Sequence, residues 1–284
     1  MPAKNLEPFD LIKGSVELSS LPEIYMRVSE VLDDPYSASE LIGAAVQVDP
    51  ALTVRLLKIV NSAFYGFPQE VATVAQAVTI IGRKELRNMV LGTAVSGMFS
   101  RISNDIFPMQ EFWYHSVRTA VLAKLLSKYR AQDIEADSLF IAGLLHDVGR
   151  LIIAHRMPDK AMIVQRQVDL DDMTAQDAEL ELFGFDHADV GAALLGLWEL
   201  PDILVETVRY HHSPEQAKNY SAEVYMVDLA SRLAHLVSPI EADEVSHYLE
   251  INKGWKQTGL EKKQVIEACA VAEDQYQLVM AMVQ

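Results

Sequence analysis

Apolar residues recur every three or four positions along almost the whole chain, which is the spacing that gives a helix one buried face. No stretch of useful length alternates apolar and polar residues, as a half-buried strand would. The 284 residues include only 13 glycines and 11 prolines, so few positions interrupt the helical pattern. The pattern therefore predicts an all-α fold.

Several helix ends are marked by local signals. Asp49-Pro50 has the form of an N-cap followed by proline at the first helical position, and it predicts a short helix that ends at Val60. Further along, Gly184 is suited to end one helix, and Asp186 is suited to cap the next, which would begin at His187. These signals support the helical prediction independently of the apolar spacing.

The chain is strongly acidic, with 40 Asp and Glu against 24 Lys and Arg and a formal net charge of −16. This charge repels nucleic acid and anionic membranes, so we expect neither as a partner. The single cysteine, Cys269, excludes an internal disulfide, and the first residues lack the basic and apolar segments of a secretory signal. Apolar stretches such as Val71–Ile81 are too short to span a bilayer. A cytoplasmic location is therefore expected.

Histidine and carboxylate residues form a series that carries the candidate chemistry. His115 lies on an apolar helical stripe, and Glu111 lies four residues earlier on nearly the same face. His146-Asp147 closes an apolar helix, and Gly149 would then let the chain turn. The later members of the series are His187 with the small Gly191 one turn after it, the pair His211-His212 at a helix end, and Asp228 in an apolar helix.

Imidazole and carboxylate ligands together suit Mn, Fe, Zn, Ni or Co, so the series predicts a site for divalent transition metal ions, two in number. Asp147 could bridge two ions about 3.5–4 Å apart, as two-metal phosphoryl-transfer sites require. Arg150, one turn later, could hold a phosphate oxygen, so Asp147 and Arg150 are the predicted catalytic residues. The ligand would be a small molecule that contains phosphate.

Each of these residues also has an ordinary structural explanation. A single inward histidine such as His115 is usually a hydrogen-bonded core residue, and Glu111 alone is typical of a solvated helix face. Asp228 could lie at the surface beside Arg232, and Arg150 could pair with any nearby acid. The full series favours metal binding, because independent accidents rarely place so many ligand types in order. The histidines interpreted as structural are His155, His235 and His247.

In the order of its candidate ligands, the chain resembles the HD superfamily of metal-dependent phosphohydrolases, in which a His, a His-Asp pair and a later Asp follow one another. Those positions are His115, His146-Asp147 and Asp228. The N-terminal part is similar to one branch of that superfamily, the HDOD family, whose members are used in bacterial signal transduction. The phrases that carry this similarity are Leu21-Pro22, Val48-Asp49-Pro50-Ala51-Leu52, the run from Leu56 to Asn61-Ser62-Ala63, and the run from Ala77 to Gly82.

The resemblance implies an HDOD domain over residues 15–212. Within it, an N-terminal helical lobe would occupy about residues 15–105, and an HD-like helical bundle would begin at about residue 106. Residues 213–284 would form a C-terminal helical extension that contributes Asp228 to the HD-like core. Many HDOD proteins have lost the metal ligands and are thought to act through partners, whereas this chain keeps a complete set.

The chain also resembles the HD-GYP phosphodiesterases, which hydrolyse cyclic di-GMP, in the segment from His187 to Gly191 and in His211-His212. The full set of metal ligands that this resemblance implies is Glu111, His115, His146, Asp147, His187, His211, His212 and Asp228. Arg150 stands where those enzymes have a lysine, and no GYP segment follows His212. Both departures argue against cyclic di-GMP as the substrate.

Two functions remain open from the sequence. One is a metal-dependent phosphohydrolase or phosphodiesterase that acts on a nucleotide or another phosphate ester. The other is a non-catalytic regulatory module that binds a signalling protein such as a kinase or a diguanylate cyclase, because the N-terminal lobe shows no recognisable catalytic spacing. The fold class alone does not separate the two.

Overall fold

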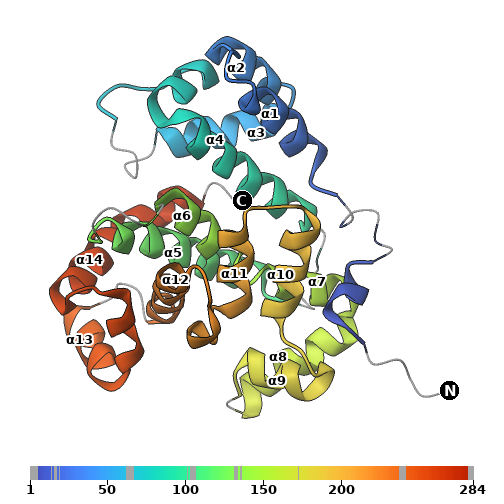
Figure 1. Ribbon diagram of the computed structural model, residues 1–284, viewed down its shortest axis with the longest axis vertical. Coiled ribbons are helices and arrows are strands. Elements are labelled where there is room, and N and C mark those ends of the chain that lie inside the picture. The colour runs from blue at the N-terminus through green and yellow to red at the C-terminus, as the bar shows by residue number, and fades with distance from the viewer. Residues whose placement is uncertain are drawn as a thin grey trace.

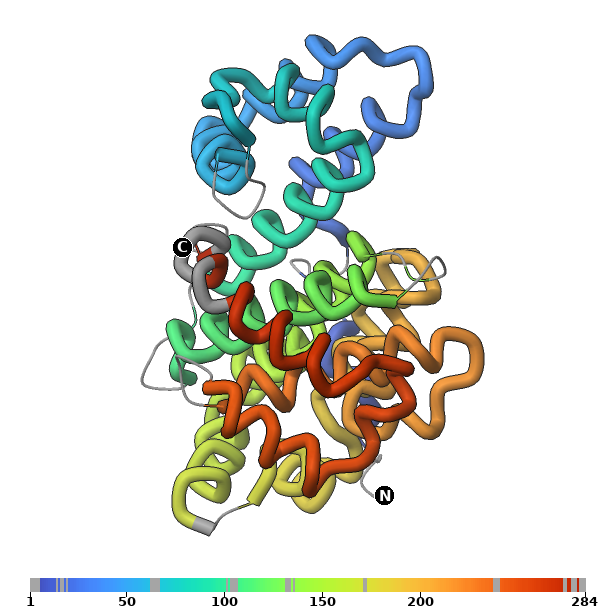
Figure 2. Tube along the Cα trace, turned by 90° about the vertical axis from the view of Figure 1, so that its left-hand side faces the viewer, coloured from blue at the N-terminus to red at the C-terminus, as the bar shows by residue number. Residues whose placement is uncertain are grey.

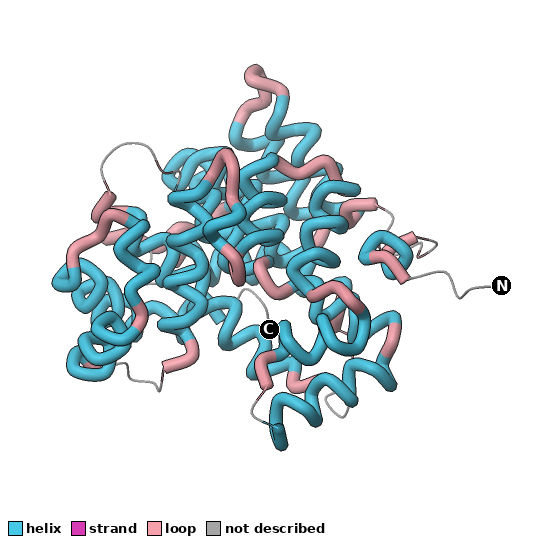
Figure 3. Tube along the Cα trace, turned by 60° about the horizontal axis from the view of Figure 1, so that its bottom comes forward, coloured by secondary structure: helices cyan, strands magenta, loops and turns pink. Residues whose placement is uncertain are grey.

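The computed structural model describes residues 6–13, 15, 18, 20–61, 67–100, 102, 107–130, 134, 136–171, 173–236 and 241–280. Within these ranges every regular element is a helix, and no strand occurs (Figure 3). The all-α fold predicted from the apolar spacing is therefore confirmed.

Four helices form an N-terminal lobe, drawn at the top of Figure 1. They are α1 (Glu23–Asp33), α2 (Ser39–Gln47), α3 (Pro50–Val60) and α4 (Val74–Met98). A short 3-10 helix, η1 (Pro8–Leu11), precedes the lobe and packs on the lower body. Helix α4 is interrupted at Gly82, where the backbone has a φ of 84°, a left-handed conformation that favours glycine. The part of α4 after this break reaches down to the lower body.

The lower body is a bundle built around one buried helix, α5 (Met109–Ser127), which packs against α6, α12 and α14 (Figure 2). The other helices of this body are α6 (Ala136–Leu145), α7 (Val148–Arg156), α8 (Pro158–Asp171), α9 (Ala175–Phe183), α10 (His187–Leu197), α11 (Asp202–Tyr210), α12 (Ser221–Ala234), α13 (Ala242–Ile251) and α14 (Lys262–Val279). Two 3-10 helices, η2 (Pro214–Gln216) and η3 (Lys253–Thr258), connect them. The C-terminal residues thus pack within the same bundle, while the exact boundaries predicted for the domain stay a prediction, and the junction at residues 105 and 106 lies outside the described residues.

The helix ends follow the local signals in the sequence. The side chain of Asp49 accepts a hydrogen bond from the backbone of Leu52 at 3.0 Å, and α3 ends at Val60 as predicted. Gly184 terminates α9 with a φ of 81°, and Asp186 caps α10, which begins at His187. These caps fix where α10 starts, and so they fix the position of its first residue.

The side chain of Asn61 has a structural role at the end of α3, in the sequence segment Asn61-Ser62-Ala63 that resembles the HDOD family. Its side chain donates to the carbonyl of Val71 at 2.9 Å and accepts from the Val71 backbone at 2.7 Å. The amide therefore closes the connection between α3 and α4 with two hydrogen bonds. Ser62 and Ala63, which complete the phrase, lie outside the described residues.

A buried ion pair joins the lobe to the bundle. Lys124 on α5 contacts Glu85 on α4 at 2.5 Å and Asp137 on α6 at 3.3 Å. The Asn88 amide of α4 also donates to the backbone carbonyl of Asp137 at 3.1 Å. Breaking a buried pair by removing one partner is strongly destabilising, so these contacts hold α4, α5 and α6 in a fixed relation.

Helices α6 and α7 form the one described segment, Ala136–Arg156, that is long and apolar enough to cross a membrane by composition. The apolar window in it is 83% buried inside the fold, and a turn at His146 divides it into two helices. The apolar character of this segment is therefore explained by its central place in the bundle.

Candidate metal centre

The turn between α6 and α7 holds the His-Asp pair at the centre of the bundle. Both His146 and Asp147 are buried. Nδ1 of His146 lies 2.7 Å from the carbonyl oxygen of Gly143, and a carbonyl only accepts, so Nδ1 carries the proton. Nε2 is then the nitrogen that faces the centre. The chain turns at His146-Asp147 itself, and the prediction that Gly149 makes the turn is wrong, because Gly149 already lies inside α7.

Gly149 serves a different purpose, which is the close approach of α7 and α10. A Cβ at this position would lie 1.9 Å from the carbonyl oxygen of His187. A Cβ at Gly191 would lie 3.0 Å from Cγ1 of Val208, so Gly191 does leave room for a close neighbour as predicted. The two glycines let α10 lie directly against α7, and this contact brings His187 to Asp147.

One group of four potential ligands forms where α7, α10 and α11 meet. Oδ1 of Asp147 lies 3.1 Å from Nε2 of His187 and 3.4 Å from Nε2 of His211. Nε2 of His212 lies 2.9 Å from Nε2 of His187. One ligand atom from each of the four residues lies within 4.8 Å of the others. The structure therefore brings these four predicted ligands together.

Two histidines of this group, His187 and His211, are held by partners on their far side. Nδ1 of His211 donates to the carbonyl of Val208 at 2.7 Å, and its Nε2 is buried without a hydrogen-bond partner. Nδ1 of His187 lies 2.6 Å from Oε2 of Glu179, which also accepts from the His187 backbone at 2.7 Å. Metal-binding histidines commonly donate their outer N–H to a carbonyl or carboxylate, which fixes the ring and frees the other nitrogen.

A second group of three ligands shares Asp147 with the first. It consists of His115, His146 and Asp147, again with ligand atoms within 4.8 Å of one another. Nε2 of His115 lies 3.2 Å from Nε2 of His146, which lies 3.4 Å from Oδ1 of Asp147. The hydroxyl of Ser231 lies 3.3 Å from both imidazole nitrogens. Asp147 thus stands between the two groups.

These donors fit divalent metal ions. Ligands bound tetrahedrally at about 2.1 Å from one ion are about 3.4 Å apart, and the separations of 2.9 to 3.4 Å found here are close to that value. The unpartnered Nε2 of His211 is the kind of buried acceptor that a cation would satisfy. Five imidazoles and one carboxylate are a donor set suited to transition metals and poorly suited to Mg²⁺ or Ca²⁺.

Two predicted ligands lie outside both groups. Glu111 is exposed at the start of α5. Asp228 is buried on α12, where its Oδ1 lies 2.6 Å from Nε of Arg232. The predicted catalytic residue Arg150 lies beside the centre, with a guanidinium nitrogen 3.4 Å from Oδ2 of Asp147 and the group 5.1 Å from the Phe107 ring centroid.

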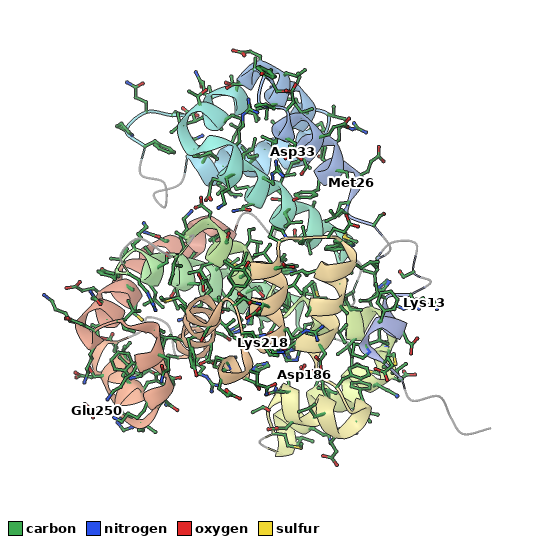
Figure 4. The ribbon with its side chains drawn as sticks, in the orientation of Figure 1. Lys13, Met26, Asp33, Asp186, Lys218 and Glu250 are labelled. Carbon is green, nitrogen blue, oxygen red and sulfur yellow. The ribbon has the colours of Figure 1, made fainter. Side chains whose placement is uncertain are left out.

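A cavity of about 420 Å³ opens onto both ligand groups. Its wall includes Asp228, Ser231, Arg232 and His235 from α12, and the turn before α9 covers another side. Asp186, labelled in Figure 4, lies where the chain passes from the α8 and α9 pair into α10. The cavity is large enough for a small-molecule ligand.

Three residues that the structure places at or beside this centre were not among the predicted site residues, and one of them, His235, was interpreted as structural. His235 stacks on His115, with ring centroids 4.2 Å apart and an angle of 26°. Ser231 and Glu179 contact ligand histidines, as described above. Ser231 and His235 lie three and seven residues after Asp228, a helical spacing that could have indicated both, whereas nothing in the sequence near Glu179 marks it as a partner of His187.

The model of the HDOD domain family matches residues 18–214, which is more than half of the chain. This chain belongs to the HDOD family. The N-terminal phrases had indicated this family, and the match confirms it. An uncharacterized protein of Treponema pallidum (strain Nichols) is 25% identical over 230 residues, which cover 79% of this HDOD protein and 44% of that relative. This HDOD protein thus spans less than half the length of the curated relative it matches.

Two solved structures share the fold over nearly the full length. One, described as a candidate phosphohydrolase from Shewanella amazonensis SB2B, is 25% identical with a TM-score of 0.78, and the alignment covers 95% of this chain and 99% of that one. The other, an HDOD domain protein of unknown function from Geobacter sulfurreducens, is 27% identical with a TM-score of 0.77 and 95% coverage of both chains. The α-helices beyond residue 214 are therefore part of the fold that these proteins share.

Burial and neighbouring charges set the protonation of the centre in this HDOD protein. Burial lowers the pKa of His146 to about 4, so the ring is neutral near neutral pH. Burial alone would lower the pKa of His187, but the carboxylates of Glu179 and Asp147 raise it to about 10. For the carboxyl group of Asp147 the effects are reversed. Burial by itself would raise its pKa, but His146 and His187 hold the pKa well below its usual range. Without metal, Asp147 is thus ionised and His187 is protonated.

Metal affinity is therefore expected to depend on pH. An ion can bind Nε2 of His187 only after that nitrogen has lost its proton. Because the pKa of His187 is about 10, the imidazole carries a proton on both nitrogens at neutral pH. Apparent affinity for Zn²⁺ should rise about tenfold per pH unit between about pH 6 and pH 8, as the release of one proton requires. Competition titrations in buffers of matched ionic strength measure this slope, and a flat profile would contradict the protonated state of His187.

The contact between Glu179 and His187 yields a second expected result. Glu179→Gln removes the charge that fixes the His187 ring, so we expect metal affinity to fall by roughly 10–100-fold, the usual effect of losing such a partner. Glu181→Gln is the matched control, because Glu181 is an exposed carboxylate on the same helix. Calorimetric titration with Zn²⁺ compares the two variants, and equal affinities would show that Glu179 does not support the site.

Proposed function

We propose that this HDOD protein binds two divalent transition metal ions at the His-Asp centre and hydrolyses a phosphate ester, either a nucleotide or another small ester. The observation that supports this proposal most strongly is the convergence of five imidazoles on Asp147. They come from α5, the turn between α6 and α7, the start of α10 and the end of α11, and they lie 3.1 to 3.4 Å from Asp147 or contact it through a neighbouring imidazole. The Shewanella amazonensis protein of similar fold, itself described as a candidate phosphohydrolase, supports the same activity.

The side chains of the centre have distinct tasks in such a reaction. When bound, divalent ions polarise a phosphate and lower the pKa of a metal-bound water. Asp147 is the shared ligand, since its carboxylate belongs to both groups. Arg150 lies at the same cavity with its guanidinium directed at Asp147, where it can bind a phosphate oxygen of the substrate. His146, Asp147, His187 and His211 are buried, and a low-dielectric environment strengthens charge interactions such as these.

The test joins metal analysis with a substrate screen. Protein purified without a His-tag should contain stoichiometric transition metal by elemental analysis, and it should hydrolyse at least one ester in a panel of phosphomonoesters and phosphodiesters. His146→Ala should lose that turnover, whereas His247→Ala, which changes an exposed histidine on α13, should keep it. Protein that holds no metal after reconstitution with Mn, Fe, Co, Ni or Zn would refute the proposal.

A regulatory function is the second candidate, and the surface of the N-terminal lobe favours it. Large apolar side chains are exposed there, among them Tyr36, which is 92% exposed, and Val48 and Val54. Exposed apolar side chains that lie together in one patch are typical of a surface that binds another protein. The expected partner is a signalling protein in the cytoplasm, such as a kinase or a diguanylate cyclase.

Lobe variants separate the two functions. Val48→Ser combined with Val54→Ser should weaken binding to a candidate kinase or diguanylate cyclase, while the metal content stays unchanged because the centre lies in the other part of the fold. Turnover that is unaffected by the double variant would show that catalysis does not need the lobe surface. Binding that is equally unaffected would remove the support that this surface gives to a regulatory function.

A further inference from the structure

The two ligand groups of the centre differ in the number of protein donors. Asp147, His187, His211 and His212 supply four, and four protein donors complete the coordination of a tetrahedral ion. His115 and His146 with the shared Asp147 supply only three. A site with three protein ligands keeps a position for an outside molecule, as catalytic zinc sites do.

Ser231 marks where the three-donor group is incomplete. Its hydroxyl lies 3.3 Å from Nε2 of both His115 and His146. A neutral hydroxyl is a weak ligand, and the nearest carboxylate on α12, that of Asp228, is engaged by Arg232 at 2.6 Å. An ion in this group would keep a coordination position that no carboxylate of the described residues fills, and this position suits an anionic ligand.

One face of α12 carries groups suited to such an anion. Ser231 and Arg232 of α12 line the cavity together with His235, which follows the end of the helix four residues after Ser231, and Arg150 lines it as well. Only Nε of Arg232 contacts Asp228, and within the described part of the chain its other guanidinium nitrogens donate to no group. A guanidinium has five N–H donors, so this residue can bind a ligand without releasing Asp228.

The donors of the cavity suit phosphate. Two guanidinium groups, of Arg150 and Arg232, line the cavity beside the carboxylates of Asp147 and Asp228 that they contact, and each guanidinium has more N–H donors than its carboxylate contact uses. Arginine with a hydroxyl and an imidazole is a donor set that suits the three or more oxygens of a phosphate group. Helix α12 lies beyond the residues that the family model matches, and the resemblance to the HD superfamily implies a role only for Asp228 on this helix.

Resting on the metal binding proposed above, we propose that the three-donor group binds its ion together with a phosphate group, and that Ser231, Arg232 and His235 on α12 recognise that phosphate. The four-donor group binds its own ion without phosphate. Occupancy of the two groups is consequently unequal until a phosphate-containing molecule is present.

Zinc titration of the metal-free full-length protein, with and without inorganic phosphate, tests this inference. Without phosphate, one equivalent of Zn²⁺ should bind tightly and a second at least about tenfold more weakly. With phosphate, the second equivalent should tighten at least about tenfold, as charge-assisted hydrogen bonds to the anion would provide. His115→Ala should abolish the phosphate-dependent binding of the second Zn²⁺ and leave the tight binding of the first Zn²⁺ unchanged. His212→Ala should weaken the tight binding of the first Zn²⁺.

The α12 face is tested with a matched pair of arginine variants. Arg232→Gln should abolish most of the effect of phosphate on the second equivalent, and Ser231→Ala should reduce it. Arg27→Gln is the control, because Arg27 pairs with Glu23 at 2.7 Å in the same four-residue helical spacing but lies on α1 in the N-terminal lobe. It should leave both equivalents and the phosphate effect unchanged.

The outcomes distinguish this inference from the proposed function. Two equivalents of equal affinity without phosphate, or an Arg232→Gln variant that behaves like Arg27→Gln, would overturn the role of α12 while leaving a two-metal hydrolase intact. Failure to bind any Zn²⁺ would overturn the metal centre and with it the proposed function.

Discussion

Asp147→Ala is expected to remove metal from both ligand groups at once. We expect metal affinity to fall by more than about 100-fold, because loss of a residue that only supports a ligand already lowers affinity by up to about 100-fold. Asp147 is the one residue common to the two groups among the described residues. Its loss also leaves the buried His187 with Glu179 as its only carboxylate partner at the centre. Elemental analysis after dialysis, followed by calorimetric titration with Zn²⁺, measures the result.

An acidic control makes the Asp147 result specific. Asp243→Ala removes an exposed carboxylate from the first turn of α13, far along the chain from every ligand, and it should leave the metal content unchanged. If Asp147→Ala instead retained two equivalents of metal, this result would contradict the assignment of Asp147 as a ligand in both groups.

Gly149→Ala is expected to destabilise the protein by about 1–3 kcal/mol, the usual cost of forcing an extra group into a packed core. The added Cβ would lie 1.9 Å from the carbonyl oxygen of His187 and 2.8 Å from the backbone nitrogen of Gly191, so α10 must move away from α7. That movement separates His187 from Asp147, and we therefore expect weaker metal binding as well. Thermal unfolding of the metal-free protein and zinc titration measure the two effects.

Gly196→Ala is the matched control on α10. A Cβ at Gly196 meets no atom within 4 Å, so alanine should fit and should stabilise the helix by up to about 1 kcal/mol. Equal stabilities for the two alanine variants would show that α7 and α10 do not pack as closely as described.

Much of the local structure could be predicted because its causes are local. Asp49, Asp186 and Gly184 act on the backbone within a few residues, and each ends or begins a helix where the sequence indicated. The predicted ligands that are fixed at helix ends, such as His187 and His211, also converge as expected. A helix end determines the position of its own residues closely.

The rest depends on how helices pack, which a helical period alone does not specify. Asp228, Ser231 and His235 share one face of α12, and only the packing of α12 on α5 decides that Ser231 reaches His115 and His146. The partnership of Glu179 with His187 likewise arises from the way α9 folds back before α10. The sequence indicated this face of α12 through Asp228, and Ser231 is the residue of the same face that contacts His115 and His146.

Helix α5 joins the interface between the lobe and the bundle to the metal centre. Lys124, which holds Glu85 of the lobe, lies nine residues after His115 on this single helix, a distance of roughly 13 Å along its axis. All residues of α5 from Ser116 to Ser127 are buried. We therefore expect a partner that displaces α4 to act on Lys124 and, through the same helix, on the position of the predicted metal ligand His115.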